Sequence, residues 1–224
     1  MSNTDSFIAE VTEEVRRDRL YALLRRYRWA AVVVILLIVG GATFSEYRKV
    51  QARTAAQDFG DAIIAALSVG DAAIRANRLS SIETGTSGGQ AVLAMLTATA
   101  LADANQQEAA VATLSRIAAN GDIPELYRQI ARFKSLTMQA DDLPLEDLRM
   151  QFEVLAQPGA PLRLLAEEQL GLLDIAAGDK DAALDRLQLI LQDAEASTIL
   201  QQRVTQVIMA LGGEPIQRPD VSQG

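Results

Sequence analysis

The sequence contains no cysteine and no histidine among its 224 residues. These absences exclude a Ser-His-Asp or Cys-His catalytic unit, a thiol redox site, a histidine-ligated haem and a zinc site built from cysteine and histidine. Aromatic residues make up only 4% of the chain although 49% of it is hydrophobic, and alanine and leucine dominate. This composition favours helices packed through small side chains over an aromatic-rich β-sandwich.

An excess of positive charge is also missing, because the formal net charge is −8. Attraction of the whole protein to nucleic acid is therefore not expected. The charge is unevenly distributed along the chain. Residues 1–28 carry six arginines against five acids, whereas residues 54–224 carry 12 basic and 23 acidic residues, a net charge of 12 − 23 = −11. The basic end and the acidic remainder are separated by the strongest signal in the sequence.

That signal is the one long hydrophobic run, WAAVVVILLIVGGATFS, which comprises the 17 uncharged residues 29–45. As a helix with about 1.5 Å per residue it would span roughly 25 Å, close to the ~30 Å core of a bilayer. Residues suited to the two interfaces flank it: Tyr27, Arg28, Tyr47 and Arg48. A buried core helix is the alternative, but one this uniformly apolar beside an arginine cluster is uncommon. The sequence therefore predicts a single transmembrane helix.

A cleavable signal peptide is a second interpretation, because Gly40 and Ala42 are small enough to precede a cleavage site. The run begins only after a long arm with five acids, whereas signal peptides usually have a short basic start. An uncleaved anchor is therefore favoured. More arginines precede the run than basic residues closely follow it, which places the N-terminus in the cytoplasm. Residues 46–224 then lie across the membrane, which in a bacterium is the periplasm.

Residues 1–28 are predicted to form a cytoplasmic amphipathic arm. Phe7, Ile8, Val11 and Val15 recur at spacings of three and four, as on one face of a helix. The arm either docks on a membrane partner or lies on anionic lipid through its arginines, and we lean slightly towards lipid.

The rest of the chain is predicted to be all-α. No segment after residue 46 shows sustained apolar–polar alternation or a β-branched run, and helix-like segments are separated by short breakers. We expect Ser80–Gln90 to be the most flexible internal loop and 212–224 to be a flexible tail. The expected helices cover 45–67, 71–79, 90–104, 106–119, 124–139, 144–156, 161–177, 180–194 and 197–211.

A repeat is visible within these helices, most clearly in Ala166–Leu191. Gly171 lies in its first helix, and Gly178, Ala183 and Leu187 follow at steps of seven, five and four residues. The same steps occur again, and a third unit contains an insertion; their anchors are Ala98, Asn105, Ala110 and Leu114, and then Ala131, Phe152 and Leu155. The small-residue anchors Ala98, Ala131 and Gly171 lie 33 and then 40 residues apart. Removing about five inserted residues from the second interval leaves spacings of about 33 and 35, on either side of a period of about 34.

That period is typical of tetratricopeptide repeats, with an irregular helical bundle as the alternative. We therefore predict a transmembrane helix followed by a tetratricopeptide-like α-solenoid. In this interpretation, 46–79 forms a helical stalk and first helix pair, and 90–211 forms the repeats with 197–211 as a capping helix.

Candidate catalytic or metal sites are few. Paired acids occur at Asp141-Asp142, Glu167-Glu168 and Asp179-Asp181, and a carboxylate pair can in principle do acid–base work or hold a divalent ion. Here they fall at predicted turns and outer helical faces, where acids are ordinarily solvated, and nothing nearby completes a mechanism. The glycines of the Ser80–Gln90 loop form no phosphate-binding loop. We expect no enzyme activity, no cofactor and no metal.

The concave face of the predicted array is the remaining candidate site. The first helix of each pair lines the groove of such arrays, and the array binds partners there. An ordinary surface is the alternative interpretation of these positions. The predicted protein-binding groove comprises Met95, Thr99, Arg128, Arg132, Glu168 and Leu172.

The order of these parts resembles a known family. It combines a short cytoplasmic helix (DSFIAEVTEEVRRDRLYALLRRY), one span, a helical stalk (EYRKVQARTAAQDFGDAI), degenerate helix pairs and a small tail. This layout is similar to that of the YfgM-type ancillary subunit of the bacterial SecYEG translocon, especially the α-proteobacterial type. The resemblance covers nearly the whole chain, and it depends on layout rather than on a catalytic motif. The weak first repeat and the insertion after Ala140 depart from the family pattern.

The resemblance implies a single-pass inner-membrane protein beside the export channel, with its C-terminal domain in the periplasm. The implied partners are the Sec translocon and periplasmic chaperones or exported polypeptides. The family supplies no catalytic residues. A self-associating scaffold that coordinates cell-envelope assembly or division is the alternative from a different functional class, and it would make the chain a homo-oligomer.

Overall fold

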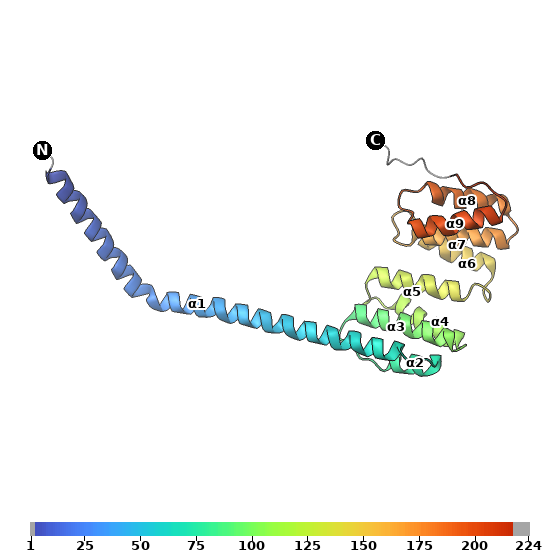
Figure 1. The fold of residues 1–224 in the computed structure, drawn as a ribbon, viewed down its shortest axis with the longest axis horizontal. Coiled ribbons are helices and arrows are strands. Elements are labelled where there is room, and N and C mark those ends of the chain that lie inside the picture. The colour runs from blue at the N-terminus through green and yellow to red at the C-terminus, as the bar shows by residue number, and fades with distance from the viewer. Residues whose placement is uncertain (1–2, 217–224) are drawn as a thin grey trace. The chain divides into compact units, whose positions relative to one another are not determined.

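The computed structural model describes the backbone of residues 3–216 and the side chains of residues 29 and 32–216. Every regular element in this part of the chain is a helix, which confirms the predicted all-α class (Figure 1). The chain divides into two compact units, Met1–Asp58 and Phe59–Gly224. The helices are α1 (Asn3–Leu67), α2 (Ala72–Ser80), α3 (Ser87–Asp103), α4 (Gln107–Ala119), α5 (Glu125–Met138), α6 (Leu145–Leu155), α7 (Arg163–Ala176), α8 (Lys180–Gln192) and α9 (Thr198–Ala210).

Helix α1 is uninterrupted over 65 residues, and no proline falls within it. The predicted arm, span and stalk therefore share one helical backbone. The arm's side chains lie outside the described residues, as do those of Ala30 and Ala31 within the predicted span. Among the side chains that are described, no helix combines the length and apolarity needed to cross a membrane. The span over 29–45 stays a prediction.

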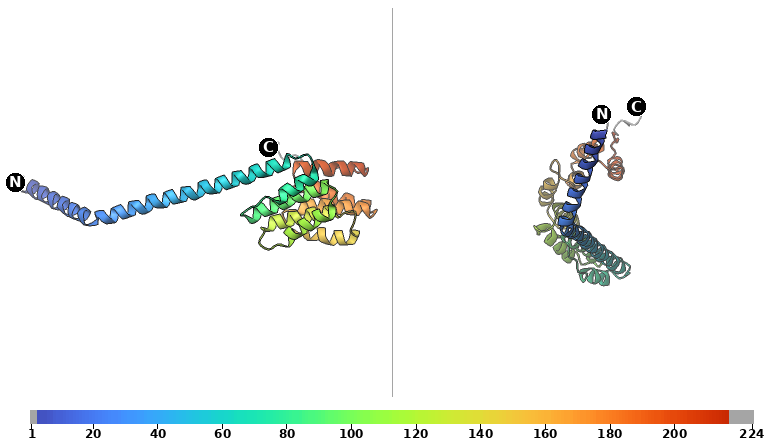
Figure 2. Two further views of the ribbon diagram at one scale, coloured as in Figure 1. Left: turned by 90° about the horizontal axis from the view of Figure 1, so that it is seen from below. Right: turned by 90° about the vertical axis from the view of Figure 1, so that its left-hand side faces the viewer.

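The helices of the second unit stack in chain order. Each helix from α2 to α8 contacts the one that follows it, and α3 also contacts α5 (Figures 1 and 2). The buried apolar side chains form successive clusters between neighbouring helices rather than one central core. Packing in which each unit is buried mainly by its neighbours is consistent with an α-solenoid.

Side-chain caps and prolines define where many of these helices begin. The side chains of Asp71, Thr86, Asp179 and Ser197 each accept a backbone N–H three residues further on, at the starts of α2, α3, α8 and α9. Prolines directly precede α5 and α6, where the missing N–H costs nothing. These signals are readable in sequence, and the predicted bounds of α2 to α9 agree with the observed ones to within three residues.

The segment Ser80–Gln90 differs from the prediction because α3 begins at Ser87, inside the expected loop. The Thr86 hydroxyl accepts the N–H of Gly89 at 3.1 Å, which caps the new helix. A Cβ added to Gly89 would lie 2.2 Å from Oγ1 of Thr84. The glycine that suggested a loop is therefore the residue that lets the preceding threonines close over the helix start.

The repeat anchors occupy the positions that the spacing required. A Cβ on Gly171 would lie 3.0 Å from Cδ2 of Leu187, so α7 and α8 approach closely at this glycine. Gly178 has φ +82°, and Asn105, at the same step of the earlier unit, has φ +58°. Both residues adopt the left-handed conformation at the turn between two helices of a pair. The other anchors are fully or almost fully buried: Ala98, Ala110, Leu114, Ala131, Phe152, Leu155, Ala183 and Leu187.

Candidate binding groove

A groove of about 680 Å³ runs across α5, α7 and α9, which are every second helix along the chain. Its apolar lining consists of Phe133, Leu165, Leu172, Val207 and Ala210. Its polar lining consists of Glu168, Gln169, Arg203 and Gln206. The groove therefore joins residues up to 77 positions apart (210 − 133) through the regular stacking of the helices.

An ion pair between α7 and α9 lies at the polar centre of this groove. Nε of Arg203 donates to Oε1 of Glu168 at 2.9 Å, and Nη2 of Arg203 donates to Oε2. The Glu168 side chain is only 8% exposed, whereas that of Arg203 is 50% exposed. The hydrogen bond from Arg203 to Glu168 raises the pKa of the guanidinium, although partial burial opposes this. Both oxygens of Glu168 accept from the Arg203 guanidinium, so the two side chains form a bidentate pair at the groove centre.

Apolar side chains flank the ion pair. Phe133 packs edge-on against the buried Phe152, with ring centroids 5.7 Å apart and an interplanar angle of 71°. Leu165 and Val207 pack against the apolar cluster of α8 and α9. Leu172 is 39% exposed and is the most accessible large apolar side chain among the described residues that line the groove. The groove thus offers apolar contact area around one fixed polar point.

The predicted groove residues are only partly brought together. Glu168 and Leu172 both line the groove. Met95 and Thr99 lie on α3, where Met95 packs against the cluster of α3, α4 and α5, and the Thr99 hydroxyl donates to the Met95 carbonyl at 3.0 Å. That part of the array lies outside the groove.

The two predicted arginines lie on α5. Arg128 forms an ion pair with Glu125 one turn earlier, and its buried Nε has no hydrogen-bond partner among the residues that the structure describes. Arg132 is half-buried, and no described residue forms an ion pair with it. Arg132 is the neighbour of Phe133, but its side chain is not part of the groove lining. A protein-binding role for all six predicted residues stays a prediction.

Sequence reasoning missed Phe133, Arg203 and Val207. The last two belong to α9, which corresponds to the predicted capping helix 197–211. In the structure α9 lines the groove together with α5 and α7, the first helices of the two preceding pairs. Arg203 and Val207 are one helical turn apart on α9. That spacing was a readable signal, whereas the pairing of Glu168 with a residue 35 positions away was not.

The acids at Glu167-Glu168 were predicted to be solvated, and this is wrong. Glu168 is buried against Arg203, and Glu167 accepts a hydrogen bond from Arg186 at 2.6 Å. Both acids instead hold helices together, because arginines of α8 and α9 reach back over α7. Asp179 caps α8 by accepting the N–H of Ala182 at 3.0 Å. The described residues contain no group of three or more acids that could hold a metal ion.

A second set of ion pairs stiffens α7 on its other side. Asp174 receives Nη1 of Arg149 at 2.6 Å and Nε of Arg186 at 3.0 Å, which links α6, α7 and α8. Burial alone would raise the pKa of Asp174, but the hydrogen bonds from both arginines outweigh it and hold the pKa below its usual value. The helix that contributes Glu168 and Leu172 to the groove is therefore fastened to both neighbouring helices.

Comparison with protein-family models, with curated proteins and with solved structures found no match to this chain.

Proposed function

We propose that this chain is a membrane-anchored protein-interaction module of the Sec export pathway, in which the tetratricopeptide-like stack binds a periplasmic chaperone or an exported polypeptide. The observation that carries this proposal is the groove across α5, α7 and α9. The groove is open, is lined mainly by apolar side chains, and has an ion pair at its centre. Extended concave surfaces of this kind are how stacked helical repeats bind partners.

The chemistry of the groove favours a protein segment as the bound partner. Its exposed apolar contact is Leu172, and its aromatic wall is Phe133, fixed by Phe152. Anchoring apolar side chains surrounded by polar groups are typical of protein interfaces, where a few buried contacts supply most of the affinity. Because Glu168 and Arg203 satisfy each other, a partner can bind over them without supplying a charge.

Exposed apolar side chains on α1 support membrane attachment. All eight residues of the run VVVILLIV, from Val32 to Val39, are between 47% and 70% exposed. A helix that is apolar on all sides needs an apolar environment, since eight exposed aliphatic side chains in water are costly. The exposed Tyr47 and the guanidinium of Arg48, 5.9 Å from the ring centre of Phe44, follow the run as expected of an interface.

The orientation and the Sec assignment rest on the sequence. The positive-inside rule places the six-arginine arm in the cytoplasm and the helical stack in the periplasm. The order of arm, apolar segment, stalk and helix pairs resembles the YfgM-type ancillary subunit of the translocon. This resemblance is what selects protein export among the many processes that use helical binding modules.

The test is site-specific photocrosslinking in living cells. A photoreactive amino acid replaces Leu172 in the groove of the full-length chain, where this residue is 39% exposed. The control places it at Met150, an apolar residue on α6 that is 53% exposed and lies outside the groove. We expect the Leu172 position, but not the Met150 position, to crosslink to a Sec component, a periplasmic chaperone or an exported chain.

Two results would overturn the proposal. Crosslinks from Leu172 only to a second copy of the chain would favour the self-associating scaffold. Equal crosslinking from both positions would show that the groove does not select partners. A reporter fused to the C-terminus tests the topology separately, because an active cytoplasmic reporter there would reverse the orientation.

A further inference from the structure

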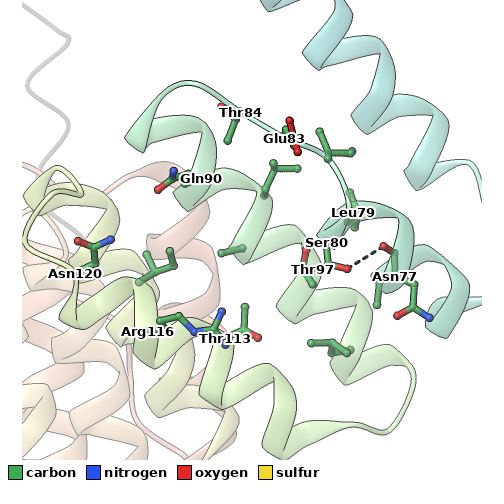
Figure 3. Close-up of a pocket in the computed structure, with 16 residues that line it drawn as sticks. Asn77, Leu79, Ser80, Glu83, Thr84, Gln90, Thr97, Thr113, Arg116 and Asn120 are labelled. Carbon is green, nitrogen blue, oxygen red and sulfur yellow. Dashed lines mark hydrogen bonds between the residues drawn. The ribbon is translucent and has the colours of Figure 1, made fainter.

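A second pocket, of about 770 Å³, lies between α2, α3 and α4, away from the groove (Figure 3). Its floor is apolar and includes the buried side chains of Ala76, Leu79, Leu93 and Ile117. Asn77 and Ser80 lie on one side of the pocket, and Arg116 and Asn120 lie on the other (Figure 3). A concave site of this size with an apolar floor and a few polar side chains has the make-up of a ligand site.

Thr97 is the unusual residue of this pocket. It is 7% exposed, yet none of the described residues forms a hydrogen bond with its hydroxyl. Nearby helical threonines behave differently: the Thr99 hydroxyl donates to the Met95 carbonyl at 3.0 Å, and that of Thr113 to the Ala109 carbonyl at 2.8 Å. The Thr97 oxygen is not one of the fully buried polar atoms that lack a partner, so this hydroxyl is open to the pocket that the residue lines. It presents an unused donor and acceptor to whatever enters the pocket.

The rim supplies polar groups but almost no net charge. Its charged side chains are one arginine, Arg116, and one acid, Glu83. The side-chain amides of Asn77 and Gln90 have no hydrogen-bond partner among the described residues. Asn120 uses its side-chain oxygen for the N–H of Asp122 at 3.0 Å, which leaves its NH₂ group for a ligand. Side-chain amides combine a donor with an acceptor, as does each unit of a peptide backbone.

We propose that this pocket binds an extended, uncharged polypeptide segment, with one large aliphatic or aromatic side chain on the apolar floor and a backbone group hydrogen-bonded to Thr97. The balanced charge of the rim disfavours a strongly charged ligand, and the surrounding acidic domain disfavours an anion. The export role proposed above would make the segment part of an unfolded exported chain. The site itself is separate from the groove, because α2, α3 and α4 build it instead of α5, α7 and α9.

The experiment measures peptide binding to the full-length chain in lipid nanodiscs. The probe is a fluorescein-labelled heptapeptide with blocked ends, Gly-Ser-Gly-Phe-Gly-Ser-Gly, and binding is followed by fluorescence anisotropy against empty nanodiscs. Thr97→Val keeps the side-chain volume and removes the hydroxyl, so we expect it to weaken binding about 2- to 10-fold. Thr137→Val on α5 is the control, and we expect no change, because that hydroxyl lies outside the pocket and already donates to the Lys134 carbonyl at 2.9 Å. Replacing the peptide's phenylalanine by alanine should weaken binding about tenfold or more.

Several outcomes would overturn this inference. Unchanged affinity in Thr97→Val, weakened affinity in Thr137→Val instead, or no peptide binding at millimolar concentration would each do so. Octanoate is the rival probe, since its carboxylate suits Arg116 and its chain suits the floor. Binding of octanoate without binding of the peptide would assign the pocket to an anionic amphiphile. None of these results alters crosslinking from Leu172, so failure of the pocket is distinguishable from failure of the proposed function.

Discussion

Replacing Asp174 by asparagine should destabilise the helical stack at neutral pH, and the effect should fade at acidic pH. The side chain is 4% exposed and receives hydrogen bonds from Arg149 and Arg186, which are 24% and 29% exposed. Asparagine has nearly the same shape, so the substitution removes the charge and leaves the packing. The two guanidinium groups then lose the carboxylate that compensates their partial burial.

The magnitude follows from how well these arginines can recover. Removing one partner of a fully buried ion pair costs about 3–5 kcal/mol. Here Arg186 retains Glu167 at 2.6 Å, and both arginines reach solvent. We therefore expect about 2–3 kcal/mol, near the lower limit of that range. For a unit of this size the melting temperature should fall by roughly 4–10 °C.

The pH dependence gives the sharper test. The pKa of Asp174 is lower in the folded chain than its usual value of 3.8, so the unfolded chain takes up this proton first. The carboxylate therefore contributes its full stability above that value and loses it as the pH falls towards the folded-state pKa. The difference between wild type and Asp174→Asn should be full at pH 7 and should shrink as the pH falls below about 4.

The assay is thermal and urea unfolding of the full-length chain, followed by circular dichroism at several pH values. Asp185→Asn is the control, because it removes one acid from an exposed position on α8 and should change stability by less than about 0.5 kcal/mol. A loss of the same size at pH 7 and pH 3, or a loss no larger than that of Asp185→Asn, would refute the reasoning.

Three further substitutions test the close approach of α7 and α8 and the predicted membrane span. Gly171→Ala should destabilise the stack, because the added Cβ would lie 3.0 Å from the fully buried Leu187. Gly60→Ala is the control: no atom lies within 4 Å of the added Cβ, so this substitution should stabilise α1 by about 0.5–1 kcal/mol. Equal shifts of the melting temperature in the two variants would contradict this reasoning. Leu36→Arg places a charge in the exposed apolar run at a cost of about 2.5–3.5 kcal/mol for insertion. It should lower the fraction of the protein that resists alkaline extraction from membranes, and an unchanged fraction would argue against a span.

Local signals predicted the helices and their turns well. The step pattern placed Gly178 and Asn105 at equivalent turns, and both residues adopt the positive φ that a helix reversal requires. Spacing succeeded because nearest-neighbour packing in a repeat depends on residues that are close in sequence. It failed at Ser87, where the glycine content of the segment outweighed the capping signal of Thr86.

The groove was harder to predict because its contents depend on contacts distant in sequence. Periodicity placed Glu168 and Leu172 on a shared helix face, and both line the groove. It could not show that Glu168 is buried and forms an ion pair with Arg203, which lies 35 residues later. Nor could it show that the Thr97 hydroxyl has no hydrogen-bond partner in the described part of the chain while that of Thr99 on the same helix has one, since both look alike in sequence.

Helix α7 connects the stability of the stack to the groove. It carries Asp174 on the face that packs against α6 and α8, and Glu168 and Leu172 on the face that lines the groove. The carboxylates on both faces are held by arginines from neighbouring helices, so the helix cannot rotate without breaking an ion pair. A stack that buries each helix mainly against its neighbours lacks a central core to hold such a helix in place. The ion pairs therefore hold Leu172 in one geometry, which is the rigidity that the proposed binding role requires.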